Sequence, residues 1–163
     1  MPDEETTNAA DLQHLRTAIT LSQAARARGD HPFGALLVGS DGKVLLEAKN
    51  TVNTLRDRTG HAERNLMTEA SLKYSAEFLA SCTMYTSTEP CAMCAGSVYW
   101  TGVGRVVYGL SEKGLNDCIG AHPENLCLNL PCRALFQAGQ REVSVVGPLV
   151  EEEALQPHLG FWN

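Results

Sequence analysis

Two short motifs constrain this chain more than any other feature: His61-Ala62-Glu63 and, further along, Pro90-Cys91-Ala92-Met93-Cys94. Cysteines three positions apart share one face of a helix, so both sulfur atoms can bind the same ion. With the imidazole of His61 they make three protein ligands, a set typical of a catalytic zinc site whose fourth position stays open. Glu63 remains available for acid–base chemistry. The motifs therefore predict one Zn²⁺ per chain, held by His61, Cys91 and Cys94.

Each motif alone has simpler explanations. A C-x-x-C motif also occurs in redox pairs and in structural zinc sites, and His-x-Glu by itself is common. A closed structural site requires a fourth Cys or His nearby, but no second C-x-x-C is formed by the remaining cysteines, Cys82, Cys118, Cys127 and Cys132. A redox pair does not require the upstream His-x-Glu. The combination of both motifs in this order favours a catalytic zinc.

Length and composition indicate one soluble domain of ordinary size. The chain has 163 residues, of which 44% are hydrophobic and 20% charged, with a net charge of −6 and a pI near 5.3. Apolar runs such as residues 35–38 are too short to span a membrane, and the acidic N-terminus lacks a signal-peptide pattern. We therefore expect a cytoplasmic protein with reduced thiols. The acidic balance favours a small substrate over a nucleic acid, which needs a basic surface.

The order of elements predicts an α/β fold with a mixed sheet. We expect a flexible tail over residues 1–9 and a single domain over residues 10–163. A hairpin through Asp41-Gly42 precedes alternating helices and strands, which is the pattern of this class. The helices are expected at 11–28, 61–73, 91–101, about 131–138 and 151–156. The strands are expected at 34–38, 44–48, 83–87, 104–108 and 143–146.

The paired motifs, His-x-Glu followed by Pro-Cys-x-x-Cys, are the signature of zinc deaminases. From the first helix onward the chain resembles the cytidine deaminase-like superfamily. The resemblance implies a three-layer α/β/α sandwich with a five-stranded mixed sheet, and a homodimer. It also implies hydrolysis of an exocyclic amine on a nucleobase or nucleoside to a carbonyl, with release of ammonia. Glu63 would be the catalytic proton shuttle in that reaction.

The resemblance further suggests which residues bind the substrate. Asn50 matches an asparagine that family members use to bind the substrate ring, and Phe33 matches a loop that lines the ring pocket. Each has a structural alternative, a loop cap for the asparagine and core packing for the aromatic ring. The C-terminal aromatics would close over the base or, equally, dock on the core or on a partner. The full predicted set is Asn50, Phe33, Ala62, Trp100, Phe161 and Trp162.

The substrate is the least constrained property. Residues 90–96 and 104–109 resemble bacterial tRNA adenosine deaminases, which makes a tRNA-specific adenosine-to-inosine deaminase the alternative function. Phe33 and the aromatic C-terminus resemble small guanine and cytosine deaminases. We therefore expect a free base or nucleoside, a guanine-type purine ahead of cytosine, and no membrane partner. A non-enzymatic partner subunit would lack Glu63, and a purely structural zinc module would show no turnover.

Overall fold

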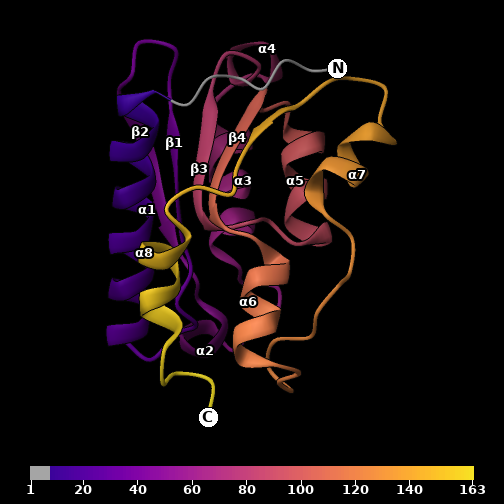
Figure 1. Cartoon of the computed structure of the whole chain (residues 1–163). Helices are drawn as coiled ribbons and strands as arrows, with labels where there is room; N and C mark the ends of the chain where they lie inside the picture. The colour runs from indigo at the N-terminus through magenta and orange to yellow at the C-terminus, as the bar shows by residue number, and fades with distance from the viewer. Residues whose placement is uncertain (1–7) are drawn as a thin grey trace.

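The computed structural model describes residues 8–163 of the chain (Figure 1). The predicted flexible tail falls mostly outside these residues, and its last two positions are already ordered. Asn8 caps helix α1 (Ala9–Ala27): its side chain accepts from the Asp11 backbone N–H, and the Asp11 carboxylate accepts from the Asn8 N–H. This reciprocal capping box satisfies two backbone donors at the helix start. Helix α1 thus begins at Ala9, the last residue of the predicted tail.

A five-stranded mixed sheet lies at the centre of the described residues, in the order β2-β1-β3-β4-β5. Strand β1 pairs antiparallel with both β2 and β3, whereas the β3–β4 and β4–β5 pairs are parallel. This confirms the predicted mixed sheet. The strands are β1 (Gly34–Val38), β2 (Val44–Lys49), β3 (Thr83–Thr88), β4 (Arg105–Leu110) and β5 (Ser144–Val146).

Helices cover both faces of the sheet, which confirms the three-layer sandwich (Figure 1). Helix α1 packs on β1 and β3, and α8 (Glu151–Leu155) packs on β4. On the other face α3 (Ala62–Lys73) packs on β1, β2 and α5 (Ala92–Thr101), and α7 (Cys132–Gln137) packs on α5. The remaining helices are α2 (Val52–Leu55), α4 (Ala76–Leu79), α6 (Glu112–Ile119) and the 3₁₀ turn η1 (Gln156–His158).

The core is split by the sheet into two apolar layers. Leu37, Met84 and Val106 belong to the cluster beneath α3 and α5, while Leu36 and Val107 belong to the cluster beneath α1. Neighbouring residues of a strand thus point to opposite faces, as strand geometry requires. Because both faces are covered, every residue of β1 is buried. The continuous apolar sequence of this strand follows from that burial.

Three short helices were not predicted: α2, α4 and α6. Helix α6 begins where the Ser111 hydroxyl accepts a hydrogen bond from the Gly114 N–H. A glycine in the first turn lowers helix propensity, so this segment has no clear helical pattern in the sequence. The turn residues were predicted correctly: Gly29 follows α1 with φ of 92°, and Gly42 lies in the β1–β2 turn with φ of 83°.

The functional segments meet at one end of the sheet, where the parallel strands β3 and β4 terminate. These strands lead there into the Glu89-Pro90-Cys91 segment and into α6. Because β1 runs antiparallel to β3, with Ala35 paired to Thr86, the beginning of β1 lies at the same end of the sheet. Binding crevices of open α/β sheets form outside the carboxyl ends of their parallel strands. The active site is therefore expected at this end of the sheet.

Candidate metal centre and active site

The three predicted metal ligands meet at the starts of two helices. His61 is the N-cap of α3, Cys91 is the N-cap of α5, and Cys94 lies in the first turn of α5. The His61 Nδ1 atom is 3.6 Å from the Cys91 Sγ and 3.5 Å from the Cys94 Sγ. All three donor atoms lie within 4.8 Å of one another. The structure therefore brings together the ligand set that the sequence predicted.

These separations fit a tetrahedral zinc ion. Zn–S bonds of about 2.3 Å and Zn–N bonds of about 2.0–2.1 Å, at a tetrahedral angle, place sulfur and nitrogen about 3.6 Å apart. The measured nitrogen–sulfur distances of 3.5 and 3.6 Å match that value. One imidazole and two soft thiolates also suit zinc better than magnesium or calcium, which prefer oxygen ligands. The residues present thus fit the metal, and they leave a fourth position for another ligand.

The two thiols differ in acidity because they are coupled. Hydrogen bonding from Cys94, together with His61 beside it, lowers the pKa of the Cys91 thiol to about 4. The same contact with Cys91, together with burial, raises the pKa of the Cys94 thiol. One thiolate therefore forms readily, whereas a second requires a neighbouring cation. A divalent metal that binds all three ligands provides that compensation.

Glu63 lies beside the metal ligands without belonging to their set. Its side chain is 4% exposed, and the Thr86 hydroxyl donates a hydrogen bond of 2.6 Å to its Oε1 atom. Burial raises the pKa of the Glu63 carboxyl above its ordinary value, which eases the uptake of a proton. A buried carboxyl group at this place suits general acid–base catalysis.

A cleft is lined by Glu63 and by two of the metal ligands, His61 and Cys91. Its acidic side chains are Glu63, Glu89, Glu112 and Glu124, and within residues 8–163 no Lys or Arg lines it. Burial, together with the charges of Cys91 and Glu89, raises the pKa of the Glu112 carboxyl to about 7. The lining residues are His31, Phe33, His61, Glu63, Thr88, Glu89, Cys91, Glu112, Leu115, Glu124 and Asn125. The cleft thus favours ligands that donate hydrogen bonds and disfavours phosphate groups.

Several residues of this cleft were missed by sequence reasoning. Glu89 accepts a hydrogen bond from the Glu112 N–H at Oε1 and from the Cys132 N–H at Oε2, over 3.1 and 3.0 Å. It thereby joins the starts of α6 and α7 to the segment that carries Cys91. Its position directly before Pro90 was the one available signal. Nothing in the sequence places His31, Glu112 or Glu124 near the motif.

Among the predicted substrate-binding residues, Phe33 and Asn50 lie beside each other. Phe33 lines the cleft, and its backbone carbonyl accepts a hydrogen bond from the Asn50 N–H. Asn50 is 1% exposed, its Oδ1 accepts from the Val52 N–H, and its Nδ2 has no partner. Ala62 is fully buried as the first residue of α3 and does not line the cleft.

Within its own chain, the structure does not place Trp100 at the cleft, and a role of this residue in substrate binding stays a prediction. Helix α5 buries Cys94, Ala95 and Val98 along one face. Trp100 lies off that face, and its side chain is 84% exposed. Within its own chain the residue therefore neither lines the site nor packs in the core.

The C-terminal aromatics support the cleft wall instead of covering the cleft. The Trp162 side chain is 8% exposed, and its indole N–H donates to the His158 Nδ1 over 3.1 Å. The centroid of its ring lies 4.8 Å from that of His31, 6.1 Å from that of Phe33 and 4.9 Å from that of Phe161. Neither Phe161 nor Trp162 lines the cleft. Trp162 is thus docked on its own chain, one of the two predicted alternatives, and closure of the aromatics over a bound base stays a prediction.

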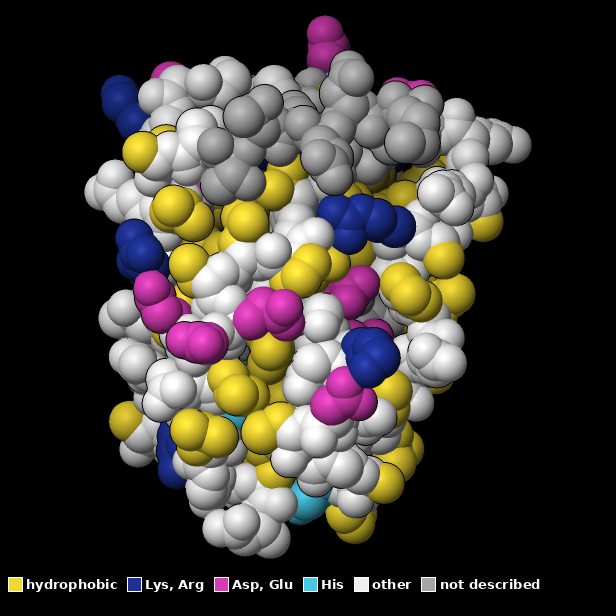
Figure 2. All heavy atoms as spheres, in the orientation of Figure 1, with side chains coloured by type: hydrophobic (Ala, Val, Ile, Leu, Met, Phe, Trp, Pro, Cys, Tyr) yellow, Lys and Arg dark blue, Asp and Glu magenta, His cyan; other side chains and the backbone are white. Residues whose placement is uncertain are grey.

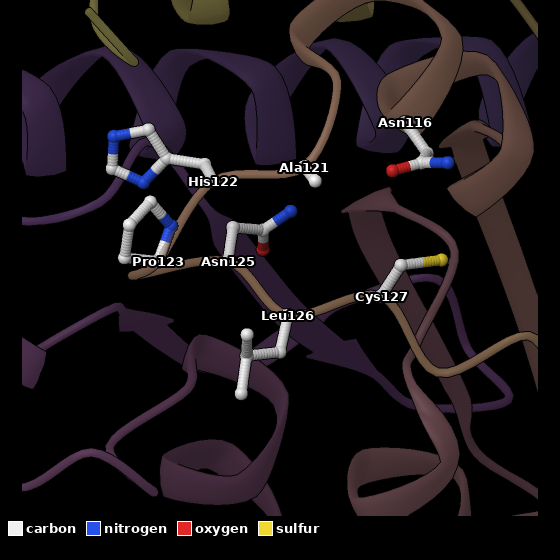
Figure 3. A pocket seen from close by; sticks show the side chains of 7 residues that line it. All are labelled: Asn116, Ala121, His122, Pro123, Asn125, Leu126 and Cys127. Carbon is white, nitrogen blue, oxygen red and sulfur yellow. The ribbon is translucent and has the colours of Figure 1, made fainter.

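A second hollow, of about 510 Å³, adjoins the cleft (Figure 3). It is lined by the end of α6 and by the loop that connects α6 to α7. It shares Asn125 with the cleft and contains none of the metal ligands. The other residues around it are Asn116, Ala121, His122, Pro123, Leu126 and Cys127. This hollow extends the site away from the metal ligands.

Acidic side chains group on the face that carries α8, whose first turn contains Glu151, Glu152 and Glu153 (Figure 2). Lys and Arg side chains on that face occur in separate small groups.

Within residues 8–163, no helix combines the length and apolar character that crossing a bilayer requires.

Comparison with known proteins agrees with this geometry. Residues 8–110 match the family described as the cytidine and deoxycytidylate deaminase zinc-binding region. The chain belongs to this family. Its fold and site define a zinc-dependent deaminase, a hydrolase that acts on carbon–nitrogen bonds, which confirms the predicted activity class and cofactor.

Individual relatives carry several substrate names. The chain is 40% identical over 153 residues to a probable cytosine deaminase of Schizosaccharomyces pombe, covering 94% of this chain and 93% of that protein. It is 38% identical over 109 residues to guanine deaminase of Bacillus subtilis, covering 63% and 69%. A solved guanine deaminase from Nitrosomonas europaea has a TM-score of 0.76 at 23% identity, covering 98% of this chain and 88% of that chain, which shows the shared fold. Relatives also include tRNA-specific adenosine deaminases.

Proposed function

We propose that this protein deaminates a free nucleobase or nucleoside. The observation that carries the proposal is the buried Glu63 beside the ligands His61, Cys91 and Cys94. Glu63, His61 and Cys91 line a cleft to which the described residues contribute no Lys or Arg. The overall change is replacement of an exocyclic amine by a carbonyl oxygen from water, with ammonia as the second product. No redox partner is required.

The residues divide the work as follows. When bound, a zinc ion lowers the pKa of a coordinated water to about 7 and so supplies a nucleophile at neutral pH. His61, Cys91 and Cys94 would hold this ion. The Glu63 carboxylate would accept a proton from the attacking water, deliver it to the ring nitrogen beside the reacting carbon, and assist the departure of ammonia. Thr86 keeps the Oε1 atom of Glu63 in place. Phe33 provides an apolar wall for a planar ring, and its neighbour Asn50 offers the ring an amide N–H₂ group.

Cytosine and guanine are the two bases that the relatives support. The probable cytosine deaminase matches 94% of the chain, and guanine deaminase matches 63% of it. The carboxylates of Glu112 and Glu124 in the cleft favour an uncharged ring with N–H donors over a phosphorylated nucleotide. A free base meets this requirement best because its ring N–H is not replaced by ribose.

A tRNA-specific adenosine deaminase is the second candidate. It is favoured by the sequence around Cys91 and along β4, and by the tRNA enzymes among the relatives. The acidic cleft and the net charge of −6 weigh against it, because binding an RNA strand requires basic side chains at its phosphates.

The deciding experiment measures ammonia release by the zinc-loaded protein from cytosine, guanine, adenine, their nucleosides and a tRNA anticodon stem-loop. We expect turnover of at least one free base or nucleoside and none of the stem-loop. Inosine formation in the stem-loop without turnover of any small substrate would establish the second candidate instead.

The assembly and location belong to the same proposal. Helices α3 and α5 expose Leu72 at 82% and Trp100 at 84%, and both helices lie in one layer of the fold. Covering such a face by a second copy gives the homodimer that we propose, and sedimentation at micromolar concentration tests it. The six cysteines, all within residues 8–163, form no disulfide, which suits the reducing cytoplasm.

A further inference from the structure

We propose that Asp30 is a positioning residue for substrate binding: it holds the segment of Asn50 so that only the amide N–H₂ of Asn50 faces the bound ring. The inference rests on the proposed function, in which Asn50 binds the substrate. No part of the deaminase motif includes Asp30. It lies in the turn after α1, 20 positions before Asn50 in the sequence.

Asp30 acts as the cap of a helix that is distant in sequence. Its side chain is fully buried, and its Oδ1 accepts hydrogen bonds from the Asn53 and Thr54 N–H groups over 3.0 and 2.8 Å. Its Oδ2 accepts a hydrogen bond from the Thr54 hydroxyl. These donors belong to the first turn of α2, where backbone N–H groups have no partner inside the helix. Thr51, at the N-cap position of α2, makes no side-chain cap of its own.

Arg28 joins this carboxylate to the backbone of Asn50. Its Nε donates to the Asp30 Oδ2 over 2.6 Å, and its Nη2 donates to the Asn50 carbonyl oxygen over 2.7 Å. Although burial raises it, hydrogen bonds from Thr54 and Arg28 leave the pKa of Asp30 below its ordinary value. The carboxylate is therefore ionised, and its hydrogen bonds are charge-assisted.

The orientation of the Asn50 amide follows from this arrangement. The remaining N–H group of the first α2 turn, that of Val52, donates to the Asn50 Oδ1 over 2.9 Å. An amide nitrogen cannot accept that bond, so the flipped orientation would set two donors against each other. The Nδ2 group is left buried without a partner. Asn50 is not among the residues that line the cleft. If it binds the ring, as in the proposed function, the substrate presents a hydrogen-bond acceptor to the Nδ2 group, a carbonyl oxygen or an unprotonated ring nitrogen.

Loss of Asp30 should act on binding more than on chemistry. Without the carboxylate, two N–H groups of α2 lose their partner and the Arg28 guanidinium keeps only the Asn50 carbonyl. The Val52 N–H that orients Asn50 then loses its fixed place. The metal ligands and Glu63 lie on α3 and α5, whose hydrogen bonds do not involve Asp30. The KM should rise while kcat changes little, whereas a purely structural role would lower the amount of folded enzyme and leave KM unchanged.

The experiment compares Asp30→Ala, Asp30→Asn, Asn50→Ala and the double variant Asp30→Ala/Asn50→Ala in the zinc-loaded protein. Hydrogen bonds to charged groups correspond to roughly tenfold or more in binding. We expect KM to rise about tenfold in Asp30→Ala, and less in Asp30→Asn, which keeps one acceptor oxygen for α2. The double variant should bind no worse than Asn50→Ala, because both changes remove the same contact. Zinc content should stay at one per chain.

Asp11→Asn is the matched control. Asp11 is also buried and is bound by Arg105 and Tyr85, far from α2 in sequence and contacts. This variant should lower the melting temperature without raising KM. If Asp30→Ala does not fold, Thr54→Val, which removes the hydroxyl bond to Asp30, tests the same contact with a smaller rise in KM.

The outcomes separate the two claims. An unchanged KM in Asn50→Ala would overturn the binding role of Asn50 itself and with it this part of the proposed function. A raised KM in Asn50→Ala with an unchanged KM in Asp30→Asn and Thr54→Val would overturn the positioning role alone. An equal rise in KM for Asp11→Asn would also contradict it.

Discussion

The Thr86 hydroxyl donates a 2.6 Å hydrogen bond to the Glu63 Oε1 and lies 3.0 Å from the Thr88 carbonyl oxygen. Thr86 is fully buried on β3. When Glu63 is ionised, the hydroxyl can donate to it. When Glu63 carries the proton, Glu63 can donate to the Thr86 oxygen, and the hydroxyl can turn to the Thr88 carbonyl. One side chain thus holds the proton shuttle in both of the states that catalysis requires.

Replacing Thr86 with valine should lower kcat while zinc and fold remain. Valine has a similar shape but offers no hydroxyl, so Glu63 loses a hydrogen bond of the charge-assisted kind, about 1.5–3 kcal/mol. We expect kcat to fall roughly tenfold or more. Thr86→Ser keeps the hydroxyl and should keep most of the activity. If steady-state kinetics at equal zinc content gave the same kcat for both variants, the proposed role of the Thr86 hydroxyl would be refuted.

The ligand assignment predicts where zinc is lost. Metal analysis of Cys91→Ala and Cys94→Ala should show most of the zinc gone, because two remaining ligands bind the ion poorly. Cys82→Ala removes a buried thiol outside the ligand set and should retain one zinc per chain. Full zinc occupancy in either ligand variant would show that the assignment is incorrect.

The stability of the C-terminal aromatic cluster should decrease in acid because His158 takes up a proton. Burial, with the nearby Arg26 charge, lowers the pKa of His158 to about 4. Since the folded-state pKa lies below that of the unfolded chain, the neutral ring contributes stability above about pH 6.5, and this contribution is lost as pH falls toward 4. His158→Gln should remove up to about 3 kcal/mol of this pH dependence. Unfolding curves of both proteins at pH 7 and pH 5 provide the test. If the free energy of unfolding of the two proteins changed equally between these pH values, the role of His158 would be contradicted.

Removing residues 160–163 should weaken turnover and leave zinc in place. Trp162 supports His31 and Phe33 from behind, so the cleft wall loses its packing when the indole is absent. We expect a loss of roughly tenfold in kcat/KM, because a displaced cleft wall misplaces the substrate relative to the reacting groups. Arg26→Lys provides a milder test, because the Arg26 Nη1 holds the Pro157 and Leu159 carbonyl groups. Undiminished kcat/KM in the truncated protein would remove the segment from the account of the site.

Sequence reasoning was most successful where functional residues lie close together in the sequence. The His-x-Glu and Pro-Cys-x-x-Cys motifs predicted the metal ligands and their place at helix starts, and the order of elements predicted the mixed sheet. Contacts between segments far apart in sequence were not accessible. The link from Asp30 to α2, the link from Glu89 to α6 and α7, and the burial of Trp162 against His31 all depend on tertiary packing.

Trp100 shows the limit of carrying a role over from a family. Its sequence position suggested a pocket residue, but the helical period of α5 is set by Cys94, Ala95 and Val98, which face the core. That period leaves Trp100 exposed in the single chain. Burial of this residue is thus a question for the proposed homodimer, and Trp100→Glu should shift the sedimentation of the protein toward the monomer.

The most direct test of the central claim is the turnover of Glu63→Gln on the best small substrate, with zinc measured in the same sample. The amide keeps the size of the side chain and can still bond to Thr86, but it cannot carry a proton between water and the ring. The account predicts one zinc per chain, an unchanged fold, and a kcat lowered roughly 100- to 10,000-fold. A variant with full zinc and a kcat within a few-fold of the wild type would contradict it.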